Sequence, residues 1–576
     1  MRIRRLWVAS VLSLAAFVLI VTRLGYLQLY CHAALLQRAN REHARQHVDD
    51  RLPRGAILDR SGVVLAMSIQ GGACYADPRR VMRADETARL LSPILHIPSN
   101  VLLGKLTQKR RFVWLARRLD PETVQHLQNL HRPGISVAPE QKRFYPEDTL
   151  ASQTIGVVGD EQEGLSGVEL VVNGWLSGRS TPFLFKQWTL AKRPAHPLAD
   201  PSDLTPRSIV LTLDRQLQTI VEQELAVQMQ LSRPKSGTVI IEDPQTGEIL
   251  AMATAPSFNP NQWGVPGSAQ QESPELLSNP AVEKIIEPGS TFKIVTAAAA
   301  LEERKVALHD NFFCENGSWQ IPGRLIHDHE KEGWLTFTEV ISHSSNIGTA
   351  KVAMRLGQTD LYRYARAFGF GMPSGCGLPG DGVGILRQPS QWRPSSLGTI
   401  SFGQEVGVTP LQMVNAYCVI ANGGTLLEPR LYKGFVDDDG TYQEWQANQP
   451  VRRVISTKTA QTMRQILQEV VANGTGKAAQ VAGLPVAGKT GTAQKIDPLT
   501  RQYSSSRYLA SFCGFAPAEH PRIVIGVFLD EPQNGYWGGS EAAPLFSRIM
   551  RNAASTLHFP NTHSGPLLIS RTIIRM

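Results

Sequence analysis

A serine and a lysine three positions apart, Ser290 and Lys293, form a pattern that could support covalent chemistry. A serine hydroxyl is a weak nucleophile at neutral pH and needs a base within hydrogen-bond reach. Pro288 and Gly289 precede Ser290, and an alanine-rich apolar helix is expected over 294–301. The spacing then places Lys293 on the same face as Ser290, one turn later. A lysine that is removed from water beside another cation can lose its proton and act as the base.

Two further patterns follow in the chain. Ser344-Ser345-Asn346 begins 54 positions after Ser290 (344 − 290). In a loop or strand, residues two apart point the same way, so the Ser344 hydroxyl could relay a proton while the Asn346 amide holds a substrate carbonyl. The third pattern, Lys489-Thr490-Gly491-Thr492, begins 145 positions after Ser344 (489 − 344).

The third pattern is expected to be a strand that binds an extended peptide. Gly491 would leave room for a peptide to add alongside as a further strand. Lys489 and the hydroxyls of Thr490 and Thr492 suit a terminal carboxylate. The Thr492 amide could complete an oxyanion hole, which the helix N-terminus at Ser290 also favours.

The three patterns are informative only together. By average composition, Ser-x-x-Lys arises by chance about twice in a chain of this length, Ser-x-Asn about as often, and Lys-Thr-Gly in roughly one chain in ten. Each alone is usually a set of surface residues or a helix cap. When all three occur in this order, the probability that they are only surface residues or caps falls to about a few per cent.

The N-terminus predicts a membrane anchor. Arg2, Arg4 and Arg5 precede Leu6–Tyr30, which is uncharged except for Arg23. Arg23 can snorkel to the membrane surface, so the stretch is long enough for one spanning helix. A cleaved signal peptide is the alternative, but no small-x-small cleavage site follows the apolar region.

Length and composition limit the function classes. The 576 residues exceed what one core supports, which predicts two or three domains. The net charge of +9 is compatible with an acidic envelope polymer or a membrane surface. Nucleic acid is disfavoured, because no basic run is interleaved with aromatic residues. The six cysteines have no metal-ligand spacing and are expected to be small buried side chains.

Local patterns outline the elements that would position these residues. Two hairpins are expected, over Arg54–Ala66 and over 237–253, and a linker is expected over Pro194–Pro206. A helix is predicted over Leu213–Gln230 and another over Ala542–Leu557. Strands are predicted over Leu509–Phe515 and Ile523–Leu529. Strands at both ends with helices between them indicate an antiparallel sheet covered by helices.

The ordered motifs are those of serine β-lactamases and penicillin-binding proteins. Over nearly the whole chain the sequence resembles the class B penicillin-binding proteins, although Ser345 stands where the middle motif often has Asp. The segments that carry the resemblance are Arg54–Ala66, Ser236–Asn261, Glu287–Lys293, His343–Ala350, Ser401–Leu411, Lys489–Gln494, Ala510–Pro517 and Tyr536–Met550.

The resemblance implies an α+β multidomain fold. A penicillin-binding transpeptidase domain like the serine β-lactamases would stand on an N-terminal α+β pedestal with one transmembrane helix. The implied parts are a cytoplasmic tail (1–5), a signal anchor (6–30), a stalk and dimerisation-type pedestal (31–205), a transpeptidase domain (206–557) and a C-terminal tail (558–576).

The implied activity is a peptidoglycan D,D-transpeptidase. Ser290 would attack the D-Ala-D-Ala bond of one stem peptide, and an amine of another stem peptide would take the acyl group. Lys293 is the implied base, Ser344 the relay and Asn346 a substrate contact, while Lys489, Thr490, Gly491 and Thr492 bind the donor. β-Lactams would be covalent inhibitors, and no cofactor or metal is implied.

The resemblance also implies a setting and leaves alternatives open. The chain would be single-pass in the cytoplasmic membrane, with its catalytic domain outside, and would work with a membrane polymerase and division proteins. Tyr75-Ala76-Asp77-Pro78 favours the septal type. The alternatives are an elongation enzyme, a β-lactam sensor or a non-catalytic division scaffold. The cluster 327–330 (His-Asp-His-Glu) could suggest a metal, but no third ligand accompanies its two histidines.

Overall fold

The computed structural model describes residues 17, 19, 53–110, 112–159, 161–178, 205–264, 273–437, 439–445, 450–497, 500 and 502–557. The predicted anchor Leu6–Tyr30 lies outside this set apart from Phe17 and Leu19, as do nearly all of the predicted linker and the whole of the tail 558–576. No helix among the described residues is long and apolar enough to cross a membrane.

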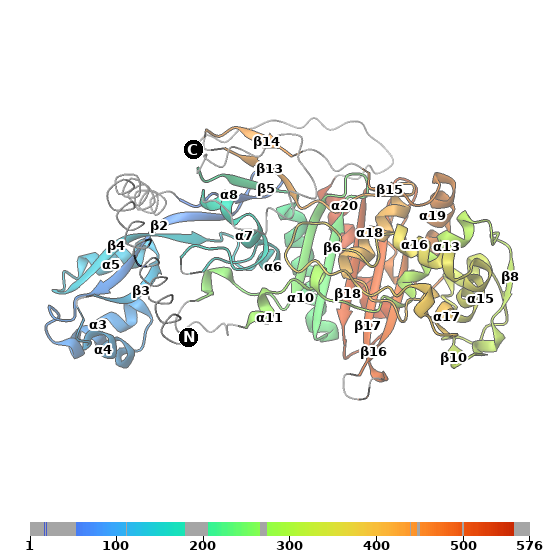
Figure 1. Cartoon of the computed structure of the whole chain (residues 1–576), viewed down its shortest axis with the longest axis horizontal. Helices are drawn as coiled ribbons and strands as arrows, with labels where there is room; N and C mark the ends of the chain where they lie inside the picture. The colour runs from blue at the N-terminus through green and yellow to red at the C-terminus, as the bar shows by residue number, and fades with distance from the viewer. Residues whose placement is uncertain are drawn as a thin grey trace, which may run out of the picture.

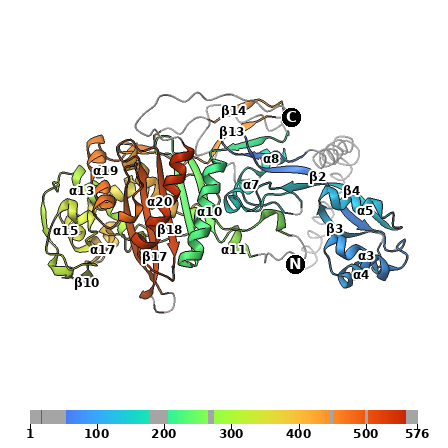
Figure 2. The ribbon, with the colours of Figure 1, turned by 180° about the vertical axis from the view of Figure 1, so that it is seen from behind.

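The described chain is elongated. Figures 1 and 2 show the elements α3, α4 and β3 near one end of the long axis and α13, α15 and β10 near the other. Between these ends, short helices and a mixed sheet connect the N-terminal region to a large antiparallel sheet (Figure 1).

The N-terminal sheet has the strand order β14-β13-β5-β1-β2-β3, with β4 also paired to β2. Its strands are β1 (Ile57–Leu58), β2 (Val64–Ala76), β3 (Val113–Leu119), β4 (Ile135–Phe144), β5 (Ser208–Leu211), β13 (Tyr432–Val436) and β14 (Tyr442–Glu444). Strands from both sides of the predicted boundary at 205/206 therefore build one sheet. The pedestal and residues 206–557, called here the catalytic region after the activity expected of it, therefore share backbone hydrogen bonds.

The predicted first hairpin is confirmed as β1 and β2. Ile57 pairs with Ala66 and Leu58 with Val64, antiparallel. The Asp59 carboxylate accepts from the backbone amides of Ser61 (2.8 Å) and Val63 (2.8 Å), which closes the turn between the strands. Asp favours such turns because its short side chain bonds the backbone two residues on.

Three helices cover the far part of this sheet: α3 (Ala84–Leu95), α4 (Ser99–Leu106) and α5 (Pro121–Asn129). Leu91, Leu102 and Leu127 pack from these helices against Cys74 and Leu115 of β2 and β3. This small core is separate from those of the catalytic region.

The catalytic region is built on a five-stranded antiparallel sheet in the order β16-β17-β18-β6-β7. Its strands are β16 (Ala487–Ile496), β17 (Tyr503–Ala516), β18 (Ile523–Asp530), β6 (Ser236–Glu242) and β7 (Ile249–Ala255). Strands from the beginning and the end of the region are neighbours, which confirms the predicted antiparallel sheet.

Side chains of each strand alternate between two cores. On β6, Val239 and Ile241 face the core made with α10 (Arg215–Ser232) and α20 (Gly538–Thr556), whereas Ile240 faces the opposite core. Helix α18 (Pro410–Ala421) lies in that opposite core and is buried along its whole length. A helix that is apolar on nearly every side is stable only in such a position.

The remaining helices complete the layer beyond α18 or connect it to the pedestal. They are α6 (Ser152–Ile155), α7 (Gly167–Val171), α8 (Asn173–Ser177), α11 (Pro274–Leu277), α12 (Pro280–Glu283), α13 (Lys293–Glu302), α14 (Phe337–Ser342), α15 (Asn346–Leu356), α16 (Gln358–Ala367), α17 (Ser396–Ser401) and α19 (Thr457–Ala472). The cysteines at 74, 314, 376, 418 and 513 are free and buried, as expected; Cys31 lies outside the described residues.

Short strands and turns of helix fill the connections. The strands are β8 (Asn311–Phe313), β9 (Ser318–Ile321), β10 (Arg324–His327), β11 (Trp334–Thr336), β12 (Thr425–Leu426) and β15 (Arg452–Arg453). The 3-10 turns are η1 (Pro260–Gln262), η2 (Gly289–Phe292), η3 (Glu315–Gly317), η4 (Pro389–Gln391) and η5 (Lys477–Ala479).

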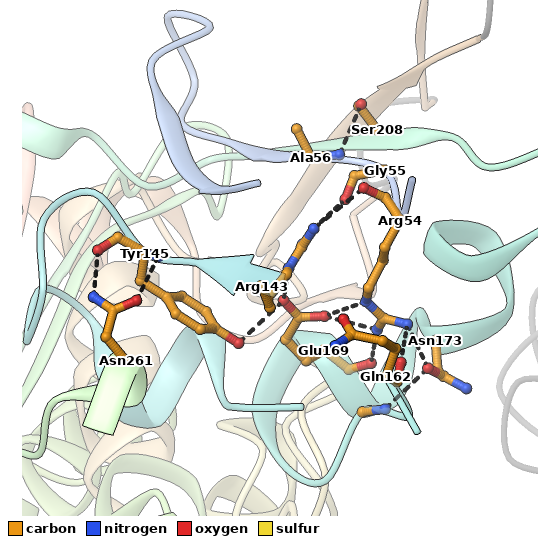
Figure 3. A network of polar contacts seen from close by, with 11 residues as sticks. Arg54, Gly55, Ala56, Arg143, Tyr145, Gln162, Glu169, Asn173, Ser208 and Asn261 are labelled. Carbon is orange, nitrogen blue, oxygen red and sulfur yellow. Dashed lines mark hydrogen bonds and ion pairs between the residues drawn. The ribbon is translucent and has the colours of Figure 1, made fainter. Parts of the chain in front are cut away.

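A buried ionic network ties the first residues of the pedestal together (Figure 3). Glu169 of α7 accepts from Arg54 Nε (2.7 Å) and from Arg143 Nε (2.7 Å), and all three side chains are almost inaccessible to water. Burial opposes ionisation of Glu169, but the two guanidiniums outweigh it and hold the pKa of Glu169 below its usual range.

The same network reaches the catalytic region through Tyr145. The Tyr145 hydroxyl lies 3.4 Å from Glu169 Oε1. The Tyr145 backbone forms a two-way pair with the side chain of Asn261, whose Nδ2 donates to the Tyr145 carbonyl (2.8 Å) while its Oδ1 accepts from the Tyr145 amide (3.0 Å) (Figure 3). Asn261 follows β7, so the pedestal is held against the catalytic sheet.

Replacing Glu169 should therefore destabilise the folded protein. Glu169→Ala leaves two buried guanidiniums without their anion, which is expected to lower the free energy of unfolding by roughly 3–5 kcal/mol. Glu161→Ala is the matched control, because Glu161 pairs with Arg117 while its side chain is 77% exposed; its cost should stay below about 1 kcal/mol. Chemical unfolding followed by tryptophan fluorescence measures both, and equal effects would contradict the structural role of the network.

Candidate active site

Ser290 lies in the 3-10 turn η2, which leads directly into α13. Gly289 has a φ of +56°, a backbone conformation that a side chain would strain, and its amide donates to the Gly403 carbonyl (3.1 Å). Thr291 Oγ1 donates to the Pro288 carbonyl (2.8 Å). Ser290 itself is partly exposed, while the residues after it are buried. The expected position of Ser290 at a helix start is confirmed.

Lys293 is the first residue of α13 and is fully buried. Its Nζ donates to the Ser344 carbonyl and lies 3.2 Å from Ser344 Oγ. Loss of solvation lowers the pKa of Lys293 to about 7, although the nearby carboxylate of Asp328 acts in the opposite direction. A substantial fraction of this amine is therefore neutral at physiological pH.

Lys489 reaches the same hydroxyl from β16. Its Nζ donates to Ser344 Oγ (2.8 Å) and to the Thr490 carbonyl (3.2 Å), and its side chain is fully buried. Burial, and then the charge of Lys293, hold the pKa of Lys489 well below its usual range. Two ammonium groups at one buried hydroxyl repel each other, so at least one amine can accept a proton near neutral pH.

The Ser344–Asn346 segment has a different backbone from the one assumed for the sequence. Ser344 has a φ of +64°, Ser345 caps α15 by accepting from the Gly348 amide (2.8 Å), and Asn346 is the first residue of that helix. The strand-like alternation assumed for Ser344 and Asn346 is therefore wrong. Asn346 Nδ2 donates to the His327 carbonyl (2.8 Å), and among the described residues no protein group donates to its Oδ1.

Asp328 belongs to the site in a role that the sequence did not predict. Its carboxylate accepts from Ser345 Oγ (2.5 Å) and from the backbone amides of Asn346 and Ile347 (3.0 Å for the latter). The sequence held one signal, because Ser345 stands where the middle motif often carries Asp. Here the carboxylate comes from the loop after β10 instead, and it stabilises the N-terminus of α15.

The strand β16 is confirmed, and its glycine has a packing role that the sequence did not predict. A side chain at Gly491 would meet Ser511 Oγ at 2.4 Å, Thr291 Cγ2 at 2.9 Å and the Pro288 carbonyl at 3.1 Å. Gly491 thus allows the turn that carries Ser290 and strand β17 to approach β16. The space was expected to serve an added peptide.

The two threonines of β16 are also held by the protein. Thr490 Oγ1 lies 2.7 Å from Thr475 Oγ1, and the Gly538 amide at the start of α20 donates to Thr492 Oγ1 (3.0 Å). Each hydroxyl retains a further hydrogen-bonding position. The structure thus gathers Lys293, Ser344 and Lys489 by direct contacts and packs β16 against the turn that carries Ser290.

The His-Asp-His-Glu cluster is not assembled as a metal centre. No group of three or more metal-ligating side chains occurs among the described residues. Asp328 is used as described above, and the His329 ring packs on Trp537 with ring centroids 4.0 Å apart.

The arrangement suits covalent transfer of an acyl group. A partly exposed serine stands at a helix start, beside two buried amines that converge on a second hydroxyl. Such a site can remove the serine proton, form an ester and return the proton to a leaving group. Backbone amides at Ser290 and Thr492 are candidates to stabilise an oxyanion.

Comparisons with known proteins agree with this chemistry. Residues 237–551 match the family described as the penicillin binding protein transpeptidase domain, and residues 50–181 match the penicillin-binding protein dimerisation domain. The chain is 34% identical to stage V sporulation protein D of Bacillus subtilis, over 96% of this chain and 86% of that protein. It is 31% identical to the probable peptidoglycan D,D-transpeptidase PenA of Neisseria meningitidis, over 94% and 92%.

A solved structure is similar over almost the same length. The crystal structure of penicillin-binding protein 3 from Mycobacterium tuberculosis, complexed with aztreonam, has a TM-score of 0.69 and 30% sequence identity. The similarity covers 90% of this chain and 99% of that one. The two-region architecture described above is therefore shared along nearly all of its length.

Proposed function

Because this chain belongs to the class B penicillin-binding proteins and is a serine-type D-Ala-D-Ala transpeptidase of peptidoglycan, we propose that Ser290 is its nucleophile. Lys293 is the general base, and Ser344 and Lys489 form the proton relay. The observation that carries this assignment is the convergence of two buried amines on the Ser344 hydroxyl, beside the turn that holds Ser290.

The first step forms an acyl-enzyme. Ser290 Oγ attacks the carbonyl carbon of the penultimate D-Ala while neutral Lys293 takes its proton. The resulting oxyanion is stabilised by the amides of Ser290 and Thr492. The C–N bond then breaks, and the departing amine of the terminal D-Ala receives a proton through Ser344.

The second step transfers the acyl group. An amine of a second stem peptide attacks the ester carbon, a C–N bond forms and the bond to Ser290 Oγ breaks. The amine gives up a proton through the same relay, and Ser290 is restored. Catalysis therefore requires a base that both accepts and returns protons near neutral pH, which a lysine with a pKa of about 7 provides.

The donor peptide is proposed to lie along β16. Lys489, Thr490 and Thr492 bind its terminal carboxylate, Asn346 contacts a backbone carbonyl or amide, and Gly491 keeps the strand close to the nucleophile turn. An incoming carboxylate favours the protonated form of Lys489, and the resulting ammonium interacts strongly with that anion in a site shielded from water.

Penicillin should form a lasting ester with Ser290. The strained lactam resembles the D-Ala-D-Ala amide, so intact-mass spectrometry is expected to find one added drug mass, located on the peptide that contains Ser290. The ester should persist, since residues 347–488 contain no Glu-x-x-Leu-Asn element to activate water, and a general base typically contributes roughly 100- to 10,000-fold.

The controls are Ser290→Ala, which should abolish the adduct, and Ser505→Ala, which removes an exposed serine and should leave it unchanged. Rapid return to the unmodified mass, or an adduct on the Ser290→Ala protein, would show that the assignment is wrong.

Acylation should depend on pH through Lys293. The second-order rate constant is expected to rise with pH around a midpoint near 7, as the Lys293 ammonium loses its proton. Asp328→Asn removes the carboxylate that raises the pKa of Lys293, so the midpoint should move to lower pH. The plateau should also fall, by up to about 100-fold, because the Ser344–Asn346 segment is displaced.

Glu330→Gln is the matched control, since Glu330 is an exposed carboxylate on the same loop. Its profile should coincide with that of the unsubstituted protein. If Asp328→Asn leaves the pH midpoint of acylation unchanged, Asp328 does not influence the pKa of Lys293. Its role would then be structural only.

We also propose a setting for the enzyme. Residues 1–5 would be cytoplasmic, 6–30 the membrane anchor, 31–205 the stalk and pedestal, 206–557 the transpeptidase domain and 558–576 a tail. The domains would lie outside the cytoplasmic membrane, where a membrane polymerase supplies peptidoglycan for the septum. The apolar stretch Leu6–Tyr30 and the resemblance at Tyr75–Pro78 support this proposal.

A fluorescent protein that matures only in the cytoplasm, fused before residue 1, tests both the membrane anchor and the septal location. The fusion should label the membrane and gather at the septum of dividing cells. Label along the side wall would indicate the elongation type, and a diffuse cytoplasmic signal would contradict the anchor.

A further inference from the structure

A cavity of about 310 Å³ opens in the segment that follows α16 and precedes α18. It is lined by Arg387, Gln391, Trp392, Arg393, Ser396 and Glu405, among others. None of its lining residues comes from β16 or from the Ser344–Asn346 segment. The mechanism proposed above leaves this cavity, called here the guanidinium cavity, without a role.

The charges in the guanidinium cavity are unevenly paired. The Glu405 carboxylate accepts from the hydroxyls of Ser396 (2.7 Å) and Thr399 (2.6 Å). No carboxylate among the residues that the structure describes forms an ion pair with Arg387 or Arg393. The one internal anion is therefore satisfied by hydroxyl groups, and two guanidiniums stay available.

The aromatic wall is held in place. Trp392 Nε1 donates to the Arg387 carbonyl (2.9 Å), so the indole and the arginine backbone are joined across the turn η4. Guanidiniums bind carboxylates with paired hydrogen bonds, and an indole accommodates an aliphatic stem. The chemistry of the cavity therefore fits a carboxylate carried on an aliphatic or peptide chain.

The floor of the cavity is connected to the nucleophile turn. The Glu405 amide donates to Glu287 Oε1 (2.9 Å), three residues before Ser290. Two residues before Glu405, the Gly403 carbonyl accepts from the Gly289 amide (3.1 Å). The segment that lines the cavity is thus hydrogen-bonded to two residues just before Ser290, and it is separate from the strand proposed for the donor.

We propose that the guanidinium cavity binds a carboxylate of the acceptor stem peptide. This inference rests on the proposed function, because it assumes a Ser290 ester that an amine attacks. Anchoring the carboxylate holds the acceptor amine near the ester carbon and raises its effective concentration over that of water. The cavity would then favour cross-linking over hydrolysis of the same ester.

The test measures how the acyl-enzyme partitions between transfer to an acceptor amine and hydrolysis. An N-benzoylated D-alanyl thioester forms the ester, and the acceptor is the tripeptide L-Ala-γ-D-Glu-L-Lys, either with free carboxylates or fully amidated. Chromatography gives the ratio of peptide product to hydrolysed donor. The unsubstituted full chain is expected to prefer the acceptor with free carboxylates.

The double substitution Arg387→Gln and Arg393→Gln should reduce that preference by roughly 10- to 100-fold, the value of losing charged hydrogen bonds. The rate at which the thioester acylates Ser290 should not change, since the donor lies elsewhere. Arg304→Gln, which removes an exposed guanidinium distant in sequence from the cavity, is the control and should keep the preference.

Three results would overturn the role of the cavity. They are an unchanged preference in the double variant, an equal loss with both acceptors, and slower acylation by the donor. Absence of a Ser290 ester in the unsubstituted protein would instead overturn the proposed function, and the cavity proposal with it.

Discussion

The burial of two lysine side chains around one hydroxyl is the constraint on which the rest of the site depends. A lysine in water keeps its proton until far above neutral pH and cannot serve as a base. Lys293 and Lys489 lose that hydration, and the charge of Lys293 acts in addition on Lys489. The cost of two buried charges is what makes a neutral amine available, so the packing that excludes water is part of the chemistry.

Several distant parts of the chain are needed to create this burial. Lys293 comes from the start of α13, Lys489 from a strand near the end of the catalytic region, and Ser344 from the turn between α14 and α15. Asp328 holds that turn through Ser345 and moderates the effect of burial on Lys293. Without such a nearby anion, desolvation alone would lower the pKa of Lys293 further.

The pedestal shows a second use of buried charge. The Glu169 carboxylate pairs with both Arg54 and Arg143, and the guanidiniums also donate to backbone carbonyls, including that of Gly55 (2.7 Å). A buried ion pair adds little net stability over apolar packing, but it tolerates few alternative arrangements. With strands β5, β13 and β14 in the same sheet, it sets the position of the pedestal relative to the catalytic region.

The sequence by itself determined the local elements and predicted which groups react. The hairpin at Asp59, the helix after Ser290 and the strand at Lys489 all follow from local spacing, turn residues and alternation, which act between near neighbours. The ordered motifs likewise predicted Ser290, Lys293, Ser344 and Lys489 as the catalytic residues, and the structure brings Lys293, Ser344 and Lys489 into contact.

Only the tertiary structure decided how these groups act on one another. The backbone at Ser344, the role of Asp328 and the reason for Gly491 depend on contacts between segments far apart in the chain, which no local pattern encodes. For the same reason, the sequence did not predict that strands near residue 57 and strands as far along the chain as residue 444 belong to one sheet. Burial, and with it the lowered pKa of Lys293, exists only after those segments have packed together and excluded water.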